Sequence, residues 1–574
     1  MSRFNRTHGQ GVPAVYTRAA TSAVRTTEVT VPTANGGGIG FKREPKGELF
    51  ITAVSNLVGQ DSMYESASDH DLRYRNLVWT VAKEDPWFVA ELARWLRREQ
   101  NLRTVAMVTA AELAASNVGT HAKELRTYAD GVVRGPVRYA VEGALARPDE
   151  AGELIAYWKR AYPQSQLPKG LKRGIASRVR DLYNERAVLK WDPDKNSVRF
   201  ADVLELTHPA PAKAFQGPLF KHLIDDRHGH GDDVPAALEM IQHNGWIRSM
   251  VREAGNTALL LDDEQLKLAG MTWEDVLSLG GQTTLSKKDL WEAIIPSMGY
   301  MALLRNLRNI ANAGVSTTVM DGVVAKLQDP DEVARSRQLP MRFLSAHRAT
   351  AGDPQWELAL SRALDLSLLN VPKLAGNTLI LVDTSGSMNG RLSERSDLKR
   401  WDAAVLFGLA LAARSERSTV VSFSSSTRIF QPREREPLLR QIERWKNEGY
   451  FLGSGTDTLG AVGAHWNGNL AYDRLVIITD EQVNGYGYAY GRHRQTGYLY
   501  GQHRQTFDVP RLEQVVPTSV PTYTWNLAGY EASHLPTGDE AHAWHAFGGL
   551  SDGAFRMIPL LEAGTSTNWP WEHE

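Results

Sequence analysis

The hydrophobic period of this chain changes once, near residue 370, and the change limits the folds available to it. From about residue 40 up to that point, apolar residues recur every three or four positions in one segment after another, a pattern typical of amphipathic helices. Beyond it, buried-strand patterns such as TLILVD (378–383) and RLVIITD (474–480) alternate with helical ones. This alternation predicts a mostly parallel sheet covered on both faces.

The helical part predicts pairs of helices stacked into an α-solenoid, because its breaks are short and contain Gly, Pro or Asp. No exact internal sequence period accompanies the pattern. A chain of 574 residues is too long for one hydrophobic core. We therefore expect an irregular lead-in at 1–38, a helical array at 39–370 and a doubly wound α/β domain at 371–574.

Charge and cysteine content narrow the functional classes. The 65 basic and 66 acidic residues nearly cancel, so any binding of nucleic acid must come from local basic patches. With no cysteine, the chain has no disulfide or thiolate metal site, which fits a cytoplasmic protein. The first residues lack the apolar core of a signal peptide, and no stretch is apolar enough to span a membrane.

Oxygen-bearing side chains follow two of the predicted strands. Asp383, Ser385 and Ser387 come directly after the first strand, and Asp480 follows RLVIIT. Thr456 lies in a Gly-rich loop, GSGTDTL (453–459). Carboxyl ends of parallel strands share one edge of a sheet, and hard oxygen ligands suit Mg²⁺ or Mn²⁺. Taken alone, the first three could also form a polar turn around a glycine.

A basic stripe is predicted on a helix within 165–191. Lys169, Arg173 and Arg180 recur at intervals of four and seven, Lys172 flanks them, and apolar residues fill another face. Such a stripe suits a phosphate backbone, although a solvated helix face is the alternative.

A second cationic segment is ALLRNLRNI (302–310). Its Arg305 and Arg308 cannot both point into an apolar core, and Asn306 could hydrogen-bond RNA. The alternative role for these residues is to cap and bridge neighbouring repeats.

No catalytic constellation is present, so we expect a protein that is not an enzyme. GGGIGFKR (36–43) is not a phosphate-binding loop, and no nucleophile elbow surrounds Ser385 or Ser387. His228 and His230 stand among acids in a short polar loop whose metal affinity would be adventitious. The insert 484–508 contains a tandem duplication, YGRHRQT and YGQHRQT, which fits either a flexible loop or a surface for single-stranded RNA.

The five oxygen-bearing residues together resemble the metal-ion-dependent adhesion site of the von Willebrand factor A family. The resemblance implies that Ser385, Ser387 and Thr456 ligate a divalent cation while Asp383 and Asp480 act mostly through water. One coordination position would then be open to a partner's carboxylate.

Segments of the helical part resemble the TROVE domain over roughly residues 35–370. They are 165–191, 198–211, 271–315 and LPMRFLSAHR (339–348). A TROVE domain followed by a von Willebrand A module resembles the architecture of the Ro family. The implied fold is a ring of HEAT-like repeats closed by the metal-site module.

The resemblance also implies a function in RNA quality control, maturation or decay. Y RNA-like small RNAs would bind the outer surface through Lys169, Lys172, Arg173 and His208. Single-stranded 3′ ends of misfolded RNA would enter a central hole near Arg305, Asn306 and Arg308. Exoribonucleases, polynucleotide phosphorylase among them, would be partners. The alternative is a metal-dependent protein-interaction scaffold without RNA.

Overall fold

The structure is a computed structural model of the chain. It describes residues 22–32, 39–55, 65–116, 125–128, 130–230, 233–338, 340–350, 353–369, 371–392, 398–433, 436–466, 472–482, 512–538, 543–549, 557–562 and 569–573. The predicted insert at 484–508 lies outside these residues, as does most of the lead-in.

Helices fill the first two thirds of the chain, as the three- and four-residue spacing predicts. The first column contains α1 (Pro45–Ser55), α2 (Ala67–Glu84), α3 (Pro86–Arg98), α4 (Arg103–Ala115), α5 (Pro136–Ala144), α6 (Glu150–Ala161), α7 (Lys169–Leu182), α8 (Glu185–Trp191), α9 (Phe200–Thr207) and α10 (Gln216–Arg227). The second contains α11 (Glu239–Arg252), α12 (Asp263–Leu268), α13 (Trp273–Gly280), α14 (Lys287–Ile294), α15 (Tyr300–Ala313), α16 (Thr317–Gln328), α17 (Pro330–Ser336), α18 (Pro340–Ala349) and α19 (Pro354–Ser367).

Local signals set where several helices begin. The Ser66 hydroxyl accepts a hydrogen bond from the backbone N–H of Asp69 and so caps α2. Asp85 caps α3 in the same way, and Pro86 occupies its first turn. These side chains satisfy backbone donors that a helix start leaves without partners. The local sequence therefore determines where these two helices begin.

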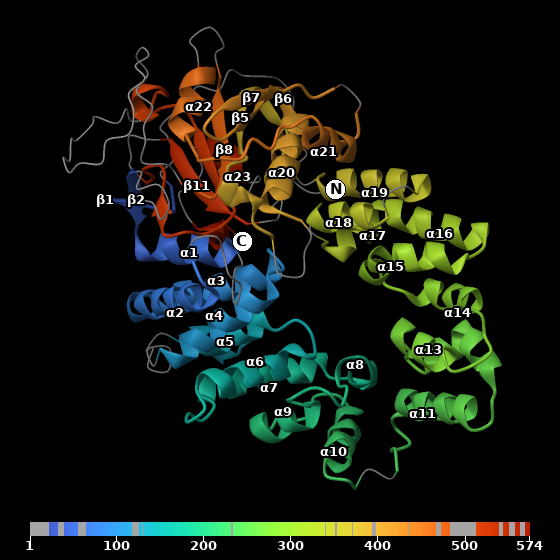
Figure 1. Cartoon of the computed structure of the whole chain (residues 1–574). Coiled ribbons are helices and arrows are strands. Elements are labelled where there is room, and N and C mark those ends of the chain that lie inside the picture. Colours follow the sequence, from blue (N-terminus) through green and yellow to red (C-terminus); the bar gives the residue numbers. More distant parts are fainter. Residues whose placement is uncertain are drawn as a thin grey trace.

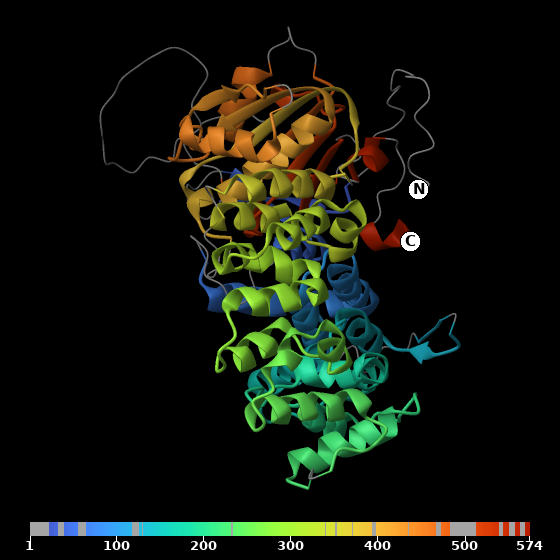
Figure 2. The same cartoon turned by 90° about the vertical axis from the view of Figure 1, so that its right-hand side faces the viewer.

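The two columns run side by side, and the chain passes from one to the other between α10 and α11 (Figure 1). Viewed from the right, the second column lies below the α/β domain (Figure 2). A small hairpin of β3 (Arg126–Thr127) and β4 (Val133–Arg134) projects from the first column. The described apolar core is divided in the same way. One cluster of buried residues belongs to the first column, whereas the second column shares its cluster with the α/β domain.

The α/β domain contains a six-stranded sheet with the order β11-β9-β8-β5-β6-β7. Its strands are β5 (Leu374–Asp383), β6 (Ser415–Phe423), β7 (Thr427–Phe430), β8 (Arg474–Thr479), β9 (Thr522–Asn526) and β11 (Trp544–Gly548). Only the edge strand β7 pairs antiparallel within it. The described helices of this domain are α20 (Arg400–Arg414), α21 (Leu438–Asn447), α22 (Thr458–His465) and α23 (Met557–Glu562).

Side chains of β5 alternate between the two faces of this sheet, because successive residues of a strand point in opposite directions. Ile380 and Val382 join the cluster that contains α20 and the second helical column. Leu379 and Leu381 join a separate cluster with α22. A mostly parallel sheet covered on both faces was predicted, and the structure confirms this fold class.

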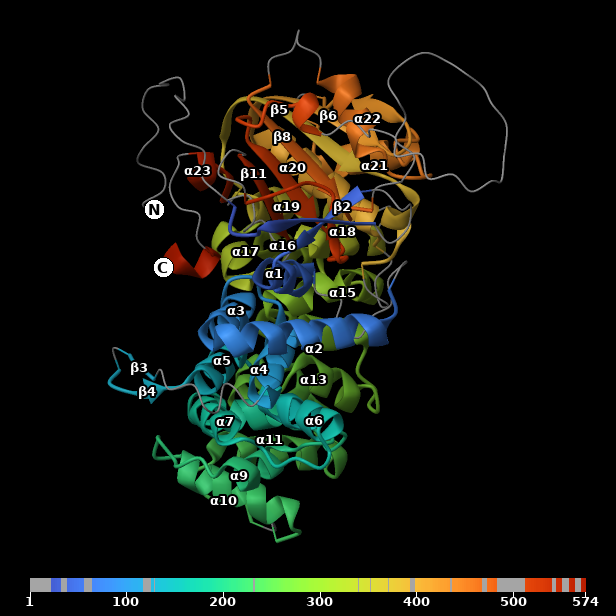
Figure 3. The same ribbon diagram turned by 90° about the vertical axis from the view of Figure 1, so that its left-hand side faces the viewer.

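Both ends of the helical array contact the α/β domain. At the first junction, β2 (Ile39–Arg43), which leads into α1, pairs with β1 (Thr26–Pro32) and with β10 (Ala532–Ser533) (Figure 3). Trp569 and Trp571 pack there against aromatic rings of α1 and α3. At the second junction, α18 and α19 pack against α20 and α21. No helix among the described residues is long and apolar enough to cross a membrane.

Candidate cation site and basic surfaces

The five predicted cation-site residues lie at one edge of the sheet. β5 and β8 are parallel neighbours, with Val382 opposite Ile478, so Asp383 and Asp480 stand at adjacent strand ends. Ser385 and Ser387 follow in a short 3-10 turn. All five side chains are buried, including Thr456. The fold therefore places oxygen atoms from three separate segments next to one another.

Hydrogen bonds position the first of these residues. The backbone N–H of Ser385 donates to Asp383 Oδ1 at 2.8 Å, and the Thr479 hydroxyl donates to Asp383 Oδ2 at 2.6 Å. The hydroxyls of Ser385 and Ser387 lie 3.2 Å apart. Thr479 was not predicted as a residue of the site, although it directly precedes Asp480. Its hydroxyl ties the two strand ends together.

The loop that carries Thr456 is held against the same turn by backbone bonds. Gly386 N–H donates to the Ser454 carbonyl at 2.7 Å, and Gly453 N–H donates to the Thr384 carbonyl at 2.9 Å. Gly453 and Ser454 both have left-handed backbone angles, which a glycine adopts readily and a serine seldom does. The Gly-rich sequence thus lets the loop double back toward the site.

The two buried carboxyl groups, Asp383 and Asp480, repel each other. Burial and then the neighbouring charge of Asp480 raise the pKa of Asp383 to about 7. Burial likewise raises the pKa of Asp480, although the positive charge of Arg400 opposes that shift. Within the described residues Asp480 Oδ2 has no hydrogen bond, and Arg400 Nη1 lies 3.9 Å from it. A divalent cation would relieve this repulsion, so the donor set fits one.

The predicted basic stripe lies on α7 as expected. Leu171, Ile175 and Val179 are buried, whereas Lys169, Arg173 and Arg180 are exposed and Lys172 is half-buried. None of these four cations forms an ion pair with any residue that the structure describes, although Arg178 of the same helix pairs with Asp181. His208 is exposed and ends α9 in a left-handed conformation.

The second cationic segment lies on α15, where Arg305 and Arg308 are exposed. Asn306 is different. It is only 5% exposed, and its side-chain amide donates to the Ala302 carbonyl and accepts from Asn309. Its polar atoms are thus used within α15, which favours the alternative structural role, and its contact with RNA stays a prediction.

Two further arginines, Arg342 and Arg98, lie near other arginines, which the sequence did not predict. Burial and then the nearby charge of Arg305 lower the pKa of Arg342 on α18. Burial and then the charge of Arg178 lower the pKa of Arg98 on α3. Arg337 Nη1 reaches from the second column to the Arg98 carbonyl at 3.1 Å. Arg98 itself donates to the carbonyls of Glu142, Gly143 and Leu145, so its guanidinium group joins α3 to α5.

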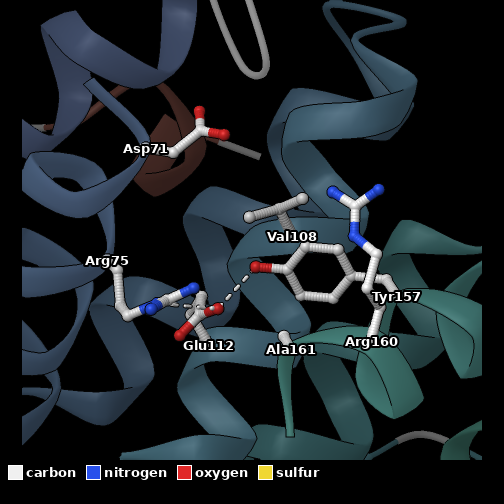
Figure 4. A pocket seen from close by; sticks show the side chains of 7 residues that line it. All are labelled: Asp71, Arg75, Val108, Glu112, Tyr157, Arg160 and Ala161. Carbon is white, nitrogen blue, oxygen red and sulfur yellow. Dashed lines mark hydrogen bonds and ion pairs between the residues drawn. The ribbon is translucent and has the colours of Figure 1, made fainter. Parts of the chain in front are cut away.

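A cavity of about 120 Å³ opens between α2, α4 and α6 (Figure 4). Glu112 lies at its base, where its carboxylate accepts hydrogen bonds from Tyr157, Tyr162 and Trp79. Arg75 lies 3.4 Å from the same carboxylate. These contacts satisfy the buried charge and join three helices, which gives Glu112 a structural role.

Metal ligands of other types do not assemble in the part of the chain that the structure describes. No group of three or more His, Cys, Asp or Glu side chains is arranged to hold a metal there. His228 donates from Nε2 to the Glu205 carboxylate and is exposed, and His230 is exposed as well.

A helical array joined at both ends to a mostly parallel α/β domain defines the class of this protein by its fold. One solved structure shares this fold, and one family model matches part of the sequence. The crystal structure of the Deinococcus radiodurans Ro (RSR) protein matches with a TM-score of 0.57 and 17% identity, over 91% of this chain and 100% of that one. Residues 264–357 match the family model described as the TROVE domain.

Curated relatives extend the match. "Telomerase protein component 1" of Rattus norvegicus is 41% identical over 347 residues, covering 53% of this chain and 13% of that protein. "RNA-binding protein RO60" of Caenorhabditis elegans is 26% identical over 260 residues, covering 41% of this chain and 40% of that protein. The chain thus spans less than half the length of either relative. Part of the chain is therefore similar in sequence to TROVE-domain proteins, and the fold is similar to that of the Deinococcus radiodurans protein.

Proposed function

We propose that this protein binds RNA without catalysing a reaction on it. The observation that carries the proposal is the basic stripe of α7, whose four cations have no acidic partner in the described structure. Lys169 and Arg180 are separated by roughly 16 Å along the helix axis, given the α-helical rise per residue, which is long enough to follow several phosphates. The name of the worm relative, an RNA-binding protein, supports the same class of ligand.

The finer form of the proposal assigns two RNA surfaces. A small structured RNA of the Y RNA type would bind the outer face through α7 and His208. A single-stranded 3′ end of misfolded RNA would reach the inside of the array near Arg305 and Arg308. Arg305 and Arg308 are both exposed on the same helix, which supports this second surface. The protein would act in the cytoplasm with an exoribonuclease such as polynucleotide phosphorylase.

Charge reversal on α7 tests the RNA proposal. A triple variant, Lys169→Glu, Lys172→Glu and Arg173→Glu, should weaken binding of a structured RNA at least tenfold at moderate salt. It should also reduce the slope of log affinity against log salt by about 2–3, because three phosphate contacts are lost. Filter binding or fluorescence anisotropy over a salt series measures both.

The matched control changes the same net charge elsewhere. Lys221, Lys267 and Arg335 are exposed cations on α10, α12 and α17, and each already pairs with an acid on its own helix. Their simultaneous change to Glu should leave the salt slope nearly unaltered. Equal losses in both triple variants would mean that bulk charge, not the α7 surface, binds RNA, and the proposal would fail.

We further propose that the strand-end site holds a divalent cation, Mg²⁺ or Mn²⁺. Ser385, Ser387 and Thr456 would ligate it, and Asp383 and Asp480 would neutralise it. Once bound, the cation supplies an electrophilic position for a carboxylate of a protein partner. Asp480 Oδ2 is buried and has no hydrogen bond to any residue that the structure describes, which supports this assignment.

The change Asp383→Ala tests whether the cation site acts independently of RNA binding. It should abolish stabilisation by Mn²⁺ in a thermal unfolding assay and leave RNA affinity within about twofold of the parent. The competing function is a metal-dependent scaffold for proteins that has no RNA ligand. It would be favoured if purified protein bound no RNA at any salt concentration.

A further inference from the structure

A buried arginine joins the helical array to the candidate cation site. Arg43, at the end of β2, has a side chain that is 0% exposed. Its guanidinium group pairs with Glu48 of α1 at 3.1 Å and with Glu481, the residue after Asp480. It also donates to the Tyr530 carbonyl at 2.9 Å. One side chain thus contacts both the first helix of the array and the segment that ends β8.

Glu481 needs these contacts to hold its conformation. Its φ angle is +63°, a left-handed value that is unfavourable for a residue with a side chain. Besides Arg43, its carboxylate accepts from Asn526, from Ser533 at 3.1 Å, and interacts with His534 at 3.1 Å. These three other partners belong to the α/β domain, so Arg43 is the contact that ties Glu481 to β2, and its removal would weaken the hold on the segment next to Asp480.

A second series of contacts, through Tyr530 and Arg400, connects Arg43 to Asp480 itself. Tyr530 uses its carbonyl to accept from Arg43 and its hydroxyl to accept from Arg400 at 3.1 Å. Arg400 then lies 3.9 Å from Asp480 Oδ2. The other end of the array reaches the same place, since Arg348 of α18 pairs with Asp402, two residues beyond Arg400.

We propose that cation binding and docking of the first end of the array are coupled, with Arg43 as the residue that positions the Asp480–Glu481 segment. The inference rests on the proposed cation site. If docking of β2 and α1 orders this segment, then cation binding must favour docking by the same factor, because linkage between two binding events is reciprocal. The cation affinity of the site would then depend on whether β2 and α1 are docked.

Two measurements on the full-length protein test the coupling. Titration calorimetry with Mn²⁺ yields the affinity of the site. Hydrogen exchange of the backbone amides of β2 and α1, with and without Mn²⁺, reports docking. In the parent, Mn²⁺ should slow this exchange. Arg43→Met should weaken Mn²⁺ binding on the order of tenfold and remove the response of β2 and α1.

The chain offers a matched control at the opposite end of the same strand. Arg474 begins β8, is 3% exposed, and pairs with Glu562 while it donates to the Ala375 carbonyl. Arg474→Met therefore also removes a buried, paired arginine, but far along the strand from Asp480. It should keep both the parental Mn²⁺ affinity and the exchange response.

Two further variants keep the test decisive if Arg43→Met does not fold. The double variant Arg43→Met, Glu481→Gln leaves no unpaired charge on Glu481 and should show the same loss of coupling. Tyr530→Phe removes only a hydroxyl and should weaken Mn²⁺ binding about threefold, as expected for one hydrogen bond.

The outcomes separate the two proposals. If the parent binds Mn²⁺ but β2 and α1 do not respond, or if these variants bind Mn²⁺ like the parent, the coupling is wrong and the cation site stands. If the parent binds no Mn²⁺, both are wrong. Weakening by Arg43→Met and not by Arg474→Met, together with the lost response, supports the coupling.

Discussion

The two junctions between the helical array and the α/β domain are built from different chemistry. At the second junction, α18 and α19 share one apolar cluster with α20 and the sheet. At the first, a buried network centred on Arg43 is joined by aromatic packing of Trp569 and Trp571. Apolar contacts tolerate small shifts, whereas a buried ion pair loses most of its value once its geometry is broken. The first junction therefore depends on buried charge to a greater extent than the second one does.

The largest expected effect comes from the second junction. Trp356 of α19 is fully buried in the shared cluster. Trp356→Ala should lower the free energy of unfolding by about 3–5 kcal/mol, the usual cost of an emptied aromatic site. Urea denaturation followed by circular dichroism measures it. Leu358→Ala on the same helix, at a residue 70% exposed, is the control. A small loss from Trp356→Ala would contradict the view that this junction is a continuous core.

Acid should weaken the sheet of the α/β domain that the first junction rests on. His545 lies on β11 and stacks on Tyr523 of β9, and burial lowers its pKa to about 4. The unfolded chain binds this proton near pH 6.5, so His545 contributes full stability above that pH and loses it as pH falls toward 4. The loss amounts to about 3 kcal/mol.

The variant His545→Leu should remove that part of the acid sensitivity between pH 6.5 and 4, as measured by unfolding at a series of pH values. His228→Gln, a change at an exposed histidine, should leave the acid sensitivity intact. An unchanged pH profile in His545→Leu would show that the acid lability arises elsewhere.

A smaller effect is expected from the aromatic contacts of the first junction. Trp571 lies 5.2 Å from Phe88 and 5.9 Å from Trp95, measured between ring centroids, and is half-buried. Trp571→Ala should cost about 1–2 kcal/mol and should speed hydrogen exchange in α1 and α3 but not in α18 and α19. Trp246→Ala, at an exposed position of α11, is the control. Faster exchange at both junctions would mean that they open together.

The smallest expected effect comes from an exposed ion pair at the second junction. Arg440 of α21 pairs with Glu357 of α19 at 2.5 Å across the second junction, but both side chains are exposed. Arg440→Ala should change the free energy of unfolding by less than about 1 kcal/mol, because solvent screens such a pair. Chemical denaturation at low and high salt measures the change. A cost above that limit would show that this exposed pair, and not only the more buried Arg348–Asp402 pair, helps to hold the second junction.

Local features of this protein were determined by the sequence alone. The spacing of Leu171, Ile175 and Val179 predicted α7 and its basic face, and the acids after the apolar runs predicted the ends of β5 and β8. Helix periodicity, caps and strand ends depend on residues near one another in the chain, so they are readable without the fold. The edge strands β7 and β11 were missed because TRIF and WHAFG lack the length or the alternation of a clear strand signal.

Only the tertiary structure decided which distant residues meet. Arg43 pairs with Glu481 across 438 positions of sequence, and Thr479 completes the hydrogen bonds of Asp383 from a neighbouring strand. Asn306 looked available on a polar face, yet packing of α15 buries it. Such pairings follow from how the columns of helices and the sheet close on one another, and packing between remote segments leaves no periodic pattern in the chain itself.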